Sequence, residues 1–276
     1  MFADVDWQDL APSQTPSTAK ATLPPGELPP EVAAALWRGN ELGSSVTQVV
    51  STGWVELDKE LPGGGWPCHA ITEVLQPQPS IAEWRLLMPA LKAIVAANKM
   101  VVIVGPAKHP HLPGLRRMGL DERHLVWIQA DTPAQRLWVT EQLVKSNACG
   151  ALIAWLPQAR QEQIRRLQIC SQICDGPVFL CRPAAAQHEA SAAPLRVELR
   201  LDLDWALRLH VLKRRGPVHE GALRLPSIPG GLESIITPRL AQPSVLISSR
   251  QERQAIPDVV GGTASRQPLP RRIAAH

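Results

Sequence analysis

Five short apolar runs alternate with helix-forming segments in the middle of the chain, and this alternation constrains the fold most strongly. The runs are Ile71–Leu75, Met100–Pro106, Leu125–Asp131, Gly150–Pro157 and Pro177–Pro183. Continuous apolar runs of this length are typical of strands buried on both faces. Strands that alternate with helices form right-handed βαβ units, so the pattern predicts an α/β fold with a mainly parallel central sheet.

The pattern changes after the last of these runs. Residues 184–194 are rich in Ala and are predicted to form a mobile loop. Apolar and charged residues then alternate strictly from Leu195, with Arg196, Glu198 and Arg200 between the apolar positions. A period of two predicts half-exposed strands, and the short Leu203–Asp204 link predicts an antiparallel hairpin.

These patterns divide the 276 residues into four parts. Residues 1–28 are rich in Pro, Ser and Thr and are predicted to be flexible. Residues 29–46 are predicted to form an N-terminal helix, because "PPEVAAALWRGNEL" begins with Pro and continues with good helix formers. Residues 47–236 form the predicted core domain. Residues 237–276 are predicted to be a flexible basic tail, so both ends of the chain are expected to be disordered.

Positive charge is concentrated toward the C-terminus. From Trp205 onward there are 11 Lys and Arg against 4 Asp and Glu, whereas the whole chain has a net charge of +4. This asymmetry indicates either an anionic partner, such as nucleic acid or an acidic protein face, or a solvated tail. The candidate nucleic-acid residues are the cluster Lys213, Arg214 and Arg215. A second basic face, equally well explained as solvated, is formed by Arg160, Arg165, Arg166 and Arg182.

The turn between the first strand and its helix is where a nucleotide-binding fold would have its phosphate loop. Such a loop needs glycines, a Lys for the phosphates and a Ser or Thr for Mg²⁺. The residues at this position are Gln76, Pro77, Gln78, Pro79 and Ser80, and then Ala82 and Glu83. Ala82 falls where the Lys would be, and Glu83 where the Ser or Thr would be. Ala154–Trp155 falls where a later strand would supply a metal-binding Asp. Both Walker motifs are therefore degenerate, and we expect no nucleotide cofactor and no metal. Ser80 and Glu83 instead fit a capping box at the start of the helix.

No other catalytic arrangement is evident. The sequence has no GxSxG motif, and its five Cys include no CxxC pair. Asp131 follows a predicted core strand and is therefore a catalytic candidate by position, but in "ADTP" it is better explained as the cap of the next helix. We assign no catalytic residue and expect that the protein is not an enzyme. The N-terminus lacks the features of a signal peptide and there is no membrane-length apolar run, so the expected location is the cytoplasm.

The order of these motifs resembles the RecA-like fold over about residues 30–230. Within that fold, the chain is most similar to the ImuA family of bacterial proteins that assist translesion DNA synthesis. The segments that carry this resemblance are "STGWVELDKELPGGGWP", "ITEVL", "VVIVGP", "LVWIQADTPAQRLWVTEQLVKSNACGALIAWLP" and "LRVELRLDLDWALRLHVLKRRGP". The elements "LWRGNEL" and "LKRRG" fit that family too. The chain is also similar to the shorter SulA family, whose members inhibit cell division by binding FtsZ. This second resemblance lies in "ITEVL", "LLMPAL", "IAWLP" and "FLCRP".

The resemblance to ImuA implies a non-catalytic adaptor in SOS-induced mutagenesis. Its implied partners are an ImuB-type polymerase-like protein, an error-prone DNA polymerase and, given the RecA-like core, RecA, with association to the nucleoid when DNA is damaged. The partner-binding candidates are Leu36 and Trp37, which would otherwise pack on the core, together with Arg271 and Arg272. Two alternatives stay open: a SulA-like division inhibitor that binds FtsZ, and a DNA-binding protein with residual nucleotide binding.

Overall fold

The computed structural model describes residues 48–79, 82–229, 232, 234–245 and 247. The predicted N-terminal segments 1–28 and 29–46, with Leu36 and Trp37, lie outside the described residues. The same is true of Ser80, Arg271 and Arg272.

The described residues form an eight-stranded sheet in the order β10-β9-β8-β3-β7-β6-β4-β5. Its strands are β3 (Ile71–Gln76), β4 (Val101–Val104), β5 (Leu125–Ile128), β6 (Ala151–Trp155), β7 (Val178–Pro183), β8 (Leu195–Leu201), β9 (Ala206–Lys213) and β10 (Leu223–Pro226). All pairings from β8 across to β5 are parallel, whereas β8, β9 and β10 pair antiparallel. The predicted α/β fold, mainly parallel with antiparallel strands toward the C-terminus, is confirmed. A separate antiparallel pair is made by β1 (Val49–Val50) and β2 (Trp66–Pro67).

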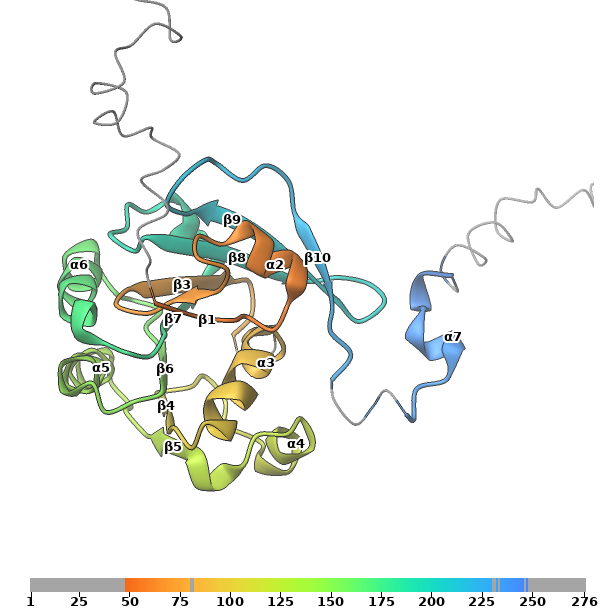
Figure 1. The fold of residues 1–276 in the computed structure, drawn as a ribbon, viewed down its shortest axis with the longest axis horizontal. Coiled ribbons are helices and arrows are strands. Elements are labelled where there is room, and N and C mark those ends of the chain that lie inside the picture. The colour runs from red at the N-terminus through yellow and green to blue at the C-terminus, as the bar shows by residue number, and fades with distance from the viewer. Residues whose placement is uncertain (1–47, 80–81, 230–231, 233, 246, 248–276) are drawn as a thin grey trace, which may run out of the picture. The chain divides into compact units, whose positions relative to one another are not determined.

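Helices cover both faces of the sheet (Figure 1). They are α2 (Val55–Glu60), α3 (Ala82–Ala96), α4 (Leu112–Arg117), α5 (Pro133–Ser146), α6 (Gln161–Cys170) and α7 (Pro238–Ala241), with single turns η2 (Glu122–His124), η3 (Ser171–Ile173) and η4 (Ala184–His188). Residues of α2, α3 and α4 belong to one apolar core, and residues of α5 and α6 to another on the opposite face. The parallel strands β3, β4, β6 and β7 are therefore buried between the two helical layers.

Pro89 lies inside α3, as the sequence indicated, and the packing around it accounts for its presence. Gly53 has a φ of 78°, and a Cβ added to it would lie 2.3 Å from Pro89 Cβ. The proline ring therefore packs directly against the Gly53 backbone. This contact offsets part of the roughly 3 kcal/mol that an interior proline costs a helix.

Strand β5 departs from the prediction that it is buried on both faces. It is the last strand of the sheet, and 39% of Val126 and 42% of Trp127 are exposed. A strand at the edge has a neighbour on one side only, so fewer side chains cover it. The imidazole of His109 packs edge-on to the Trp127 indole, with 5.0 Å between the ring centroids.

The predicted hairpin is present as β8 and β9. Asp204 and Trp205 have φ values of 57° and 58°, and Ala206 N donates to Leu203 O across 3.2 Å. Two successive left-handed residues are typical of the tight turns that match the twist of paired strands. The expectation that the charged positions of β8 are exposed is wrong for Arg196 and Glu198, which are 7% and 6% exposed.

Part of the range 237–276 is described. Helix α7 is tied to the hairpin turn, because Trp205 Nε1 donates to Leu240 O across 2.9 Å. Ser244 N and Oγ also donate to the Asp204 carboxylate, at 3.0 and 2.8 Å. These bonds give residues 238–244 a defined position beside the turn.

Candidate functional site

The strand-to-helix turn has the position predicted for a phosphate loop. β3 ends at Gln76 and α3 begins at Ala82, and Pro77, Gln78 and Pro79 between them are exposed. Gln76 is buried, and within the described residues neither polar atom of its side chain has a hydrogen-bond partner.

The two positions at which a Walker-type site would hold a metal are in direct contact with each other. Trp155, at the end of β6, donates a hydrogen bond from Nε1 to Glu83 Oε1 across 2.9 Å. Both side chains are almost fully buried, with 2% and 1% exposed, and the Trp84 and Trp155 rings lie 5.9 Å apart. The direct contact leaves no room for an ion between these two side chains. Ser80 is not described, so its predicted capping box with Glu83 stays a prediction.

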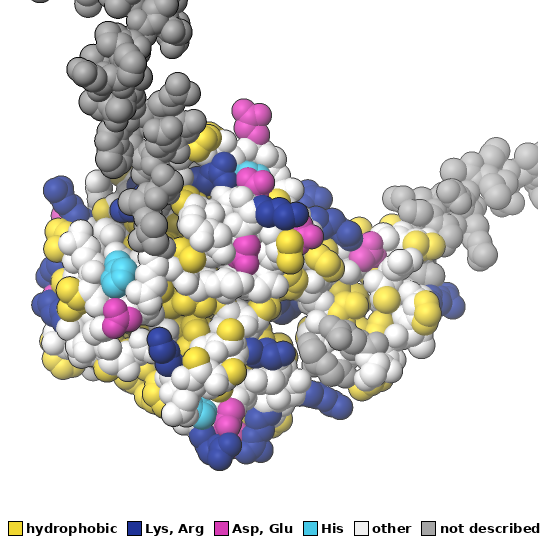
Figure 2. All heavy atoms as spheres, in the orientation of Figure 1, with side chains coloured by type: hydrophobic (Ala, Val, Ile, Leu, Met, Phe, Trp, Pro, Cys, Tyr) yellow, Lys and Arg dark blue, Asp and Glu magenta, His cyan; other side chains and the backbone are white. Residues whose placement is uncertain are grey.

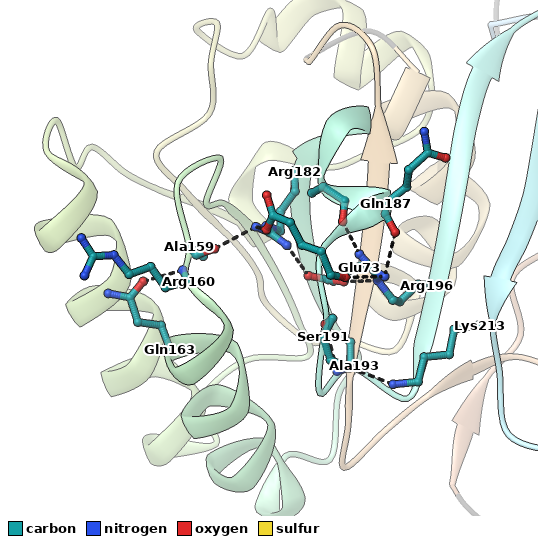
Figure 3. A network of polar contacts seen from close by, with 12 residues as sticks. Glu73, Ala159, Arg160, Gln163, Arg182, Gln187, Ser191, Ala193, Arg196 and Lys213 are labelled. Atoms are coloured by element: carbon teal, nitrogen blue, oxygen red, sulfur yellow. Dashed lines mark hydrogen bonds and ion pairs between the residues drawn. The ribbon is translucent and has the colours of Figure 1, made fainter.

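A second group of buried polar side chains, on β3 and the two strands beside it, was not predicted from the sequence. Glu73 in β3 is fully buried and lies between two arginines, as Figure 3 shows. Its Oε1 is 3.0 Å from Arg182 Nη1, and its Oε2 is 2.5 Å from Arg196 Nε. Arg182 Nη2 also contacts Glu189 Oε2 at 2.6 Å, so two carboxylates balance the two guanidinium groups.

This network also anchors the segment that follows β7. Arg196 Nη2 donates to Ala186 O across 2.6 Å, and its Nη1 donates to Glu189 O across 3.2 Å. Ala186 and Ala193 are buried. The prediction that residues 184–194 form a mobile loop is therefore wrong, because buried arginines satisfy its carbonyl groups.

Arg182 was also expected to add to a basic surface, and it does not, since only 1% of its side chain is exposed. The one sequence feature that could have predicted this buried ion-pair network is Glu73, a charged residue inside the apolar run of β3. A carboxylate at such a position needs cations on the neighbouring strands.

The basic cluster does not form one continuous surface. Lys213 Nζ donates to Ser191 O across 2.8 Å, and its pKa is lowered by burial and then by Arg196. Arg214 contacts Glu60 Oε2 at 3.1 Å and donates to the Glu60 carbonyl as well. Of these three cluster residues, Arg215 is the one that is exposed without such a contact to the described residues, and it borders a cavity of about 190 Å³.

A polar cleft of about 550 Å³ lies between the first turns of α5 and α6. Arg136 and Arg160 line it, together with Asp131 and Gln163.

The predicted cap of α5 is corrected by one residue. Thr132, not Asp131, accepts the bond from Gln135 N at 3.2 Å, because its extended backbone places the hydroxyl over the helix end. Of the remaining basic residues, Arg165 is exposed and Arg166 contacts Glu141 Oε2 at 2.6 Å.

Within the part of the chain that the structure describes, no three His, Cys, Asp or Glu side chains come together to hold a metal ion. Among the same residues, no helix is both long and apolar enough to cross a membrane.

The chain is similar to bacterial RecA proteins over less than half of its length. It is 33% identical over 132 residues to the RecA proteins of Symbiobacterium thermophilum and of Chlorobaculum tepidum, which covers 45% of this chain and 37% of each relative. It is 36% identical over 123 residues to the RecA of Sinorhizobium medicae, which covers 42% of this chain and 33% of the relative. The chain thus spans about a third of the length of these relatives. No protein-family model matches it. These matches and the mainly parallel sheet together support a RecA-like relationship.

Proposed function

We propose that this protein is a non-catalytic adaptor in translesion DNA synthesis induced by DNA damage. Its partners are an ImuB-type polymerase-like protein, an error-prone DNA polymerase and RecA, and it acts in the cytoplasm at damaged regions of the nucleoid.

The link to DNA damage rests on the similarity to RecA and on the order of sequence motifs that resembles the ImuA family. The matched segments exceed 30% identity in three relatives, and the sheet has the predicted order of parallel and antiparallel strands. A shared fold alone would not specify a function, because one fold can support many chemistries.

The proposal of a non-catalytic role rests on the Glu83–Trp155 hydrogen bond, which is the observation that carries it. Hydrolysis of a nucleoside triphosphate requires Mg²⁺ and a cation at the phosphates. Here an indole and a carboxylate contact each other at the metal positions, Ala82 takes the place of the Lys, and Pro77 and Pro79 remove two backbone donors from the turn.

The surfaces proposed for partners are the segment with Leu36 and Trp37 and the basic end with Arg271 and Arg272. Apolar anchors such as Leu and Trp suit a groove on a partner, and arginines suit an acidic rim.

Affinity capture from DNA-damaged cells tests the proposal, with the full chain and a version ended after Ile247 as baits. That cut keeps the Asp204–Ser244 bonds and removes Arg271 and Arg272. The full chain is expected to recover the two polymerase-type partners, and the shortened chain to recover less. Recovery of FtsZ without either partner would support a division inhibitor and reject the adaptor role.

Titration with ATP and Mg²⁺, using a RecA protein as the positive control, tests the non-catalytic part separately. We expect no saturable binding at micromolar ATP. Saturable binding there would mean that the turn still accommodates phosphates.

A further inference from the structure

A groove on the face of the sheet that carries α3 is lined by apolar and cationic side chains. It has a volume of about 380 Å³ and lies between α3, the end of α4 and residues 226–229. Its apolar lining includes Trp54, Met88, Pro89 and Met118. In the region of α3 and α4, Figure 2 shows hydrophobic side chains among Lys and Arg groups. The volume is within the range of sites that bind small ligands or a few side chains of a peptide.

Two cations border the groove, and neither Asp nor Glu lines it. Arg85 is fixed, because its Nε donates to Ser227 O across 2.9 Å and its Nη2 to Ser227 Oγ across 2.5 Å. Within the described residues its Nη1 has no hydrogen-bond acceptor. Lys92 is exposed, and its stem passes close to Gly119, where an added Cβ would lie 2.9 Å from Lys92 Cε. The groove thus combines an apolar floor with positive charge at its rim.

We propose that this groove binds a short acidic segment of another protein, with a large apolar side chain against Met88 and Met118 and a carboxylate near Lys92. Methionine side chains are flexible and polarisable, so they adapt to apolar groups of different shapes. A carboxylate at the rim matches the positive charge there, which favours an acidic segment over a basic one.

The C-terminal segment of a second copy of this chain is a poor occupant on charge grounds. Among the described residues, the large exposed apolar side chains of this segment are Ile235, Leu240, Val245 and Ile247, and Arg239 lies among them in the sequence. That segment is also tied to its own hairpin turn through Leu240 O. Docking it into the groove of another copy would bring Arg239 toward Lys92 and Arg85. The inference rests on the groove alone and not on the adaptor role.

This proposal is tested with a library of random twelve-residue peptides. The displayed peptides are selected for binding to the full chain. The expected peptides carry Asp or Glu beside Leu, Phe or Trp. The best peptide is then labelled with fluorescein, and its dissociation constant is measured by anisotropy. Lys92→Glu is expected to weaken binding about five- to thirtyfold, since the loss of one exposed ion pair and the added repulsion together contribute about 1–2 kcal/mol. Met118→Ala is expected to weaken it as well.

The matched control is Lys108→Glu, which changes an exposed lysine that does not line the groove and is expected to leave affinity unchanged. Circular dichroism confirms that each variant is folded, and Lys92→Gln gives an intermediate loss without repulsion. Enrichment of basic peptides, no enrichment, or equal effects of Lys92→Glu and Lys108→Glu would each overturn the proposal. So would self-association of the chain that Lys92→Glu abolishes.

Discussion

Replacing Glu73 by Gln removes the negative charge that lies between two buried arginines. The Glu73 side chain is 0% exposed, and the side chains of Arg182 and Arg196 are 1% and 8% exposed. The Gln amide can accept a hydrogen bond from one guanidinium, but its NH₂ group then faces the other. Glu189 still pairs with Arg182, so the charge of Arg196 becomes the least compensated.

Breaking a buried ion pair from one side typically costs about 3–5 kcal/mol, because a charge is left in a medium of low dielectric constant. For a domain of about 150–250 residues, each 1 kcal/mol lowers the melting temperature by about 2–4 °C. Glu73→Gln is therefore expected to lower it by about 6–20 °C. Urea unfolding should show a lower midpoint with an unchanged slope, because the buried area is the same.

The control is Glu122→Gln, which breaks the partly exposed Arg116–Glu122 pair and should change stability by less than about 1 kcal/mol. In the double variant Glu73→Gln with Arg196→Met, the uncompensated cation is gone, so the loss should be smaller than the sum of the single losses. Two results would refute the prediction. One is a loss of unfolding free energy below about 1 kcal/mol for Glu73→Gln alone, and the other is a loss in the double variant equal to the sum of the two single losses. Either would show that water reaches the arginines.

Three further predictions concern other polar and thiol groups. Trp155→Phe replaces the indole by a smaller aromatic ring and leaves the Glu83 carboxylate without this donor, and should lower the unfolding free energy by about 1–3 kcal/mol without creating micromolar ATP binding. Burial raises the pKa of Cys68, Cys149 and Cys174 to about 11, so a thiol reagent at pH 8 should modify these three slowly in the native chain and completely in denaturant, as peptide mapping would measure. The Glu60 carboxyl has its pKa lowered first by the hydrogen bond from His219, so its stabilising effect is present above its ordinary value of 4.5 and is lost as pH falls below it. Protection factors against hydrogen exchange in residues 214–219, which correct for the intrinsic slowing of exchange at low pH, should fall over that range in the wild type and much less in Glu60→Gln.

The apolar runs predicted the sheet well, because burial between two helical layers demands such runs in any sequence. The exposure of Trp127 could not be predicted in the same way, since a run of apolar residues does not state whether its strand lies at an edge. The alternation in β8 was misleading for a different reason. Arg196 has the spacing of a solvent-facing residue, and only the parallel pairing of β8 with β3 reveals that it faces Glu73. The site at the turn was partly predictable, because the missing Lys is visible in the sequence, whereas the Glu83–Trp155 contact depends on how β6 and α3 pack.

The ion-pair network also limits how the protein can respond to a partner. Opening residues 184–194 would separate Glu189 from Arg182 and expose the carbonyl groups that Arg196 binds. If this costs about 3–5 kcal/mol, as for other buried pairs, the open form is populated at about one part in 10² to 10⁴. A ligand that required the open form would have its apparent affinity reduced by the same factor. Binding is therefore favoured at surfaces that are already formed, such as the groove beside Lys92, where Arg85 is held by Ser227 before any partner arrives.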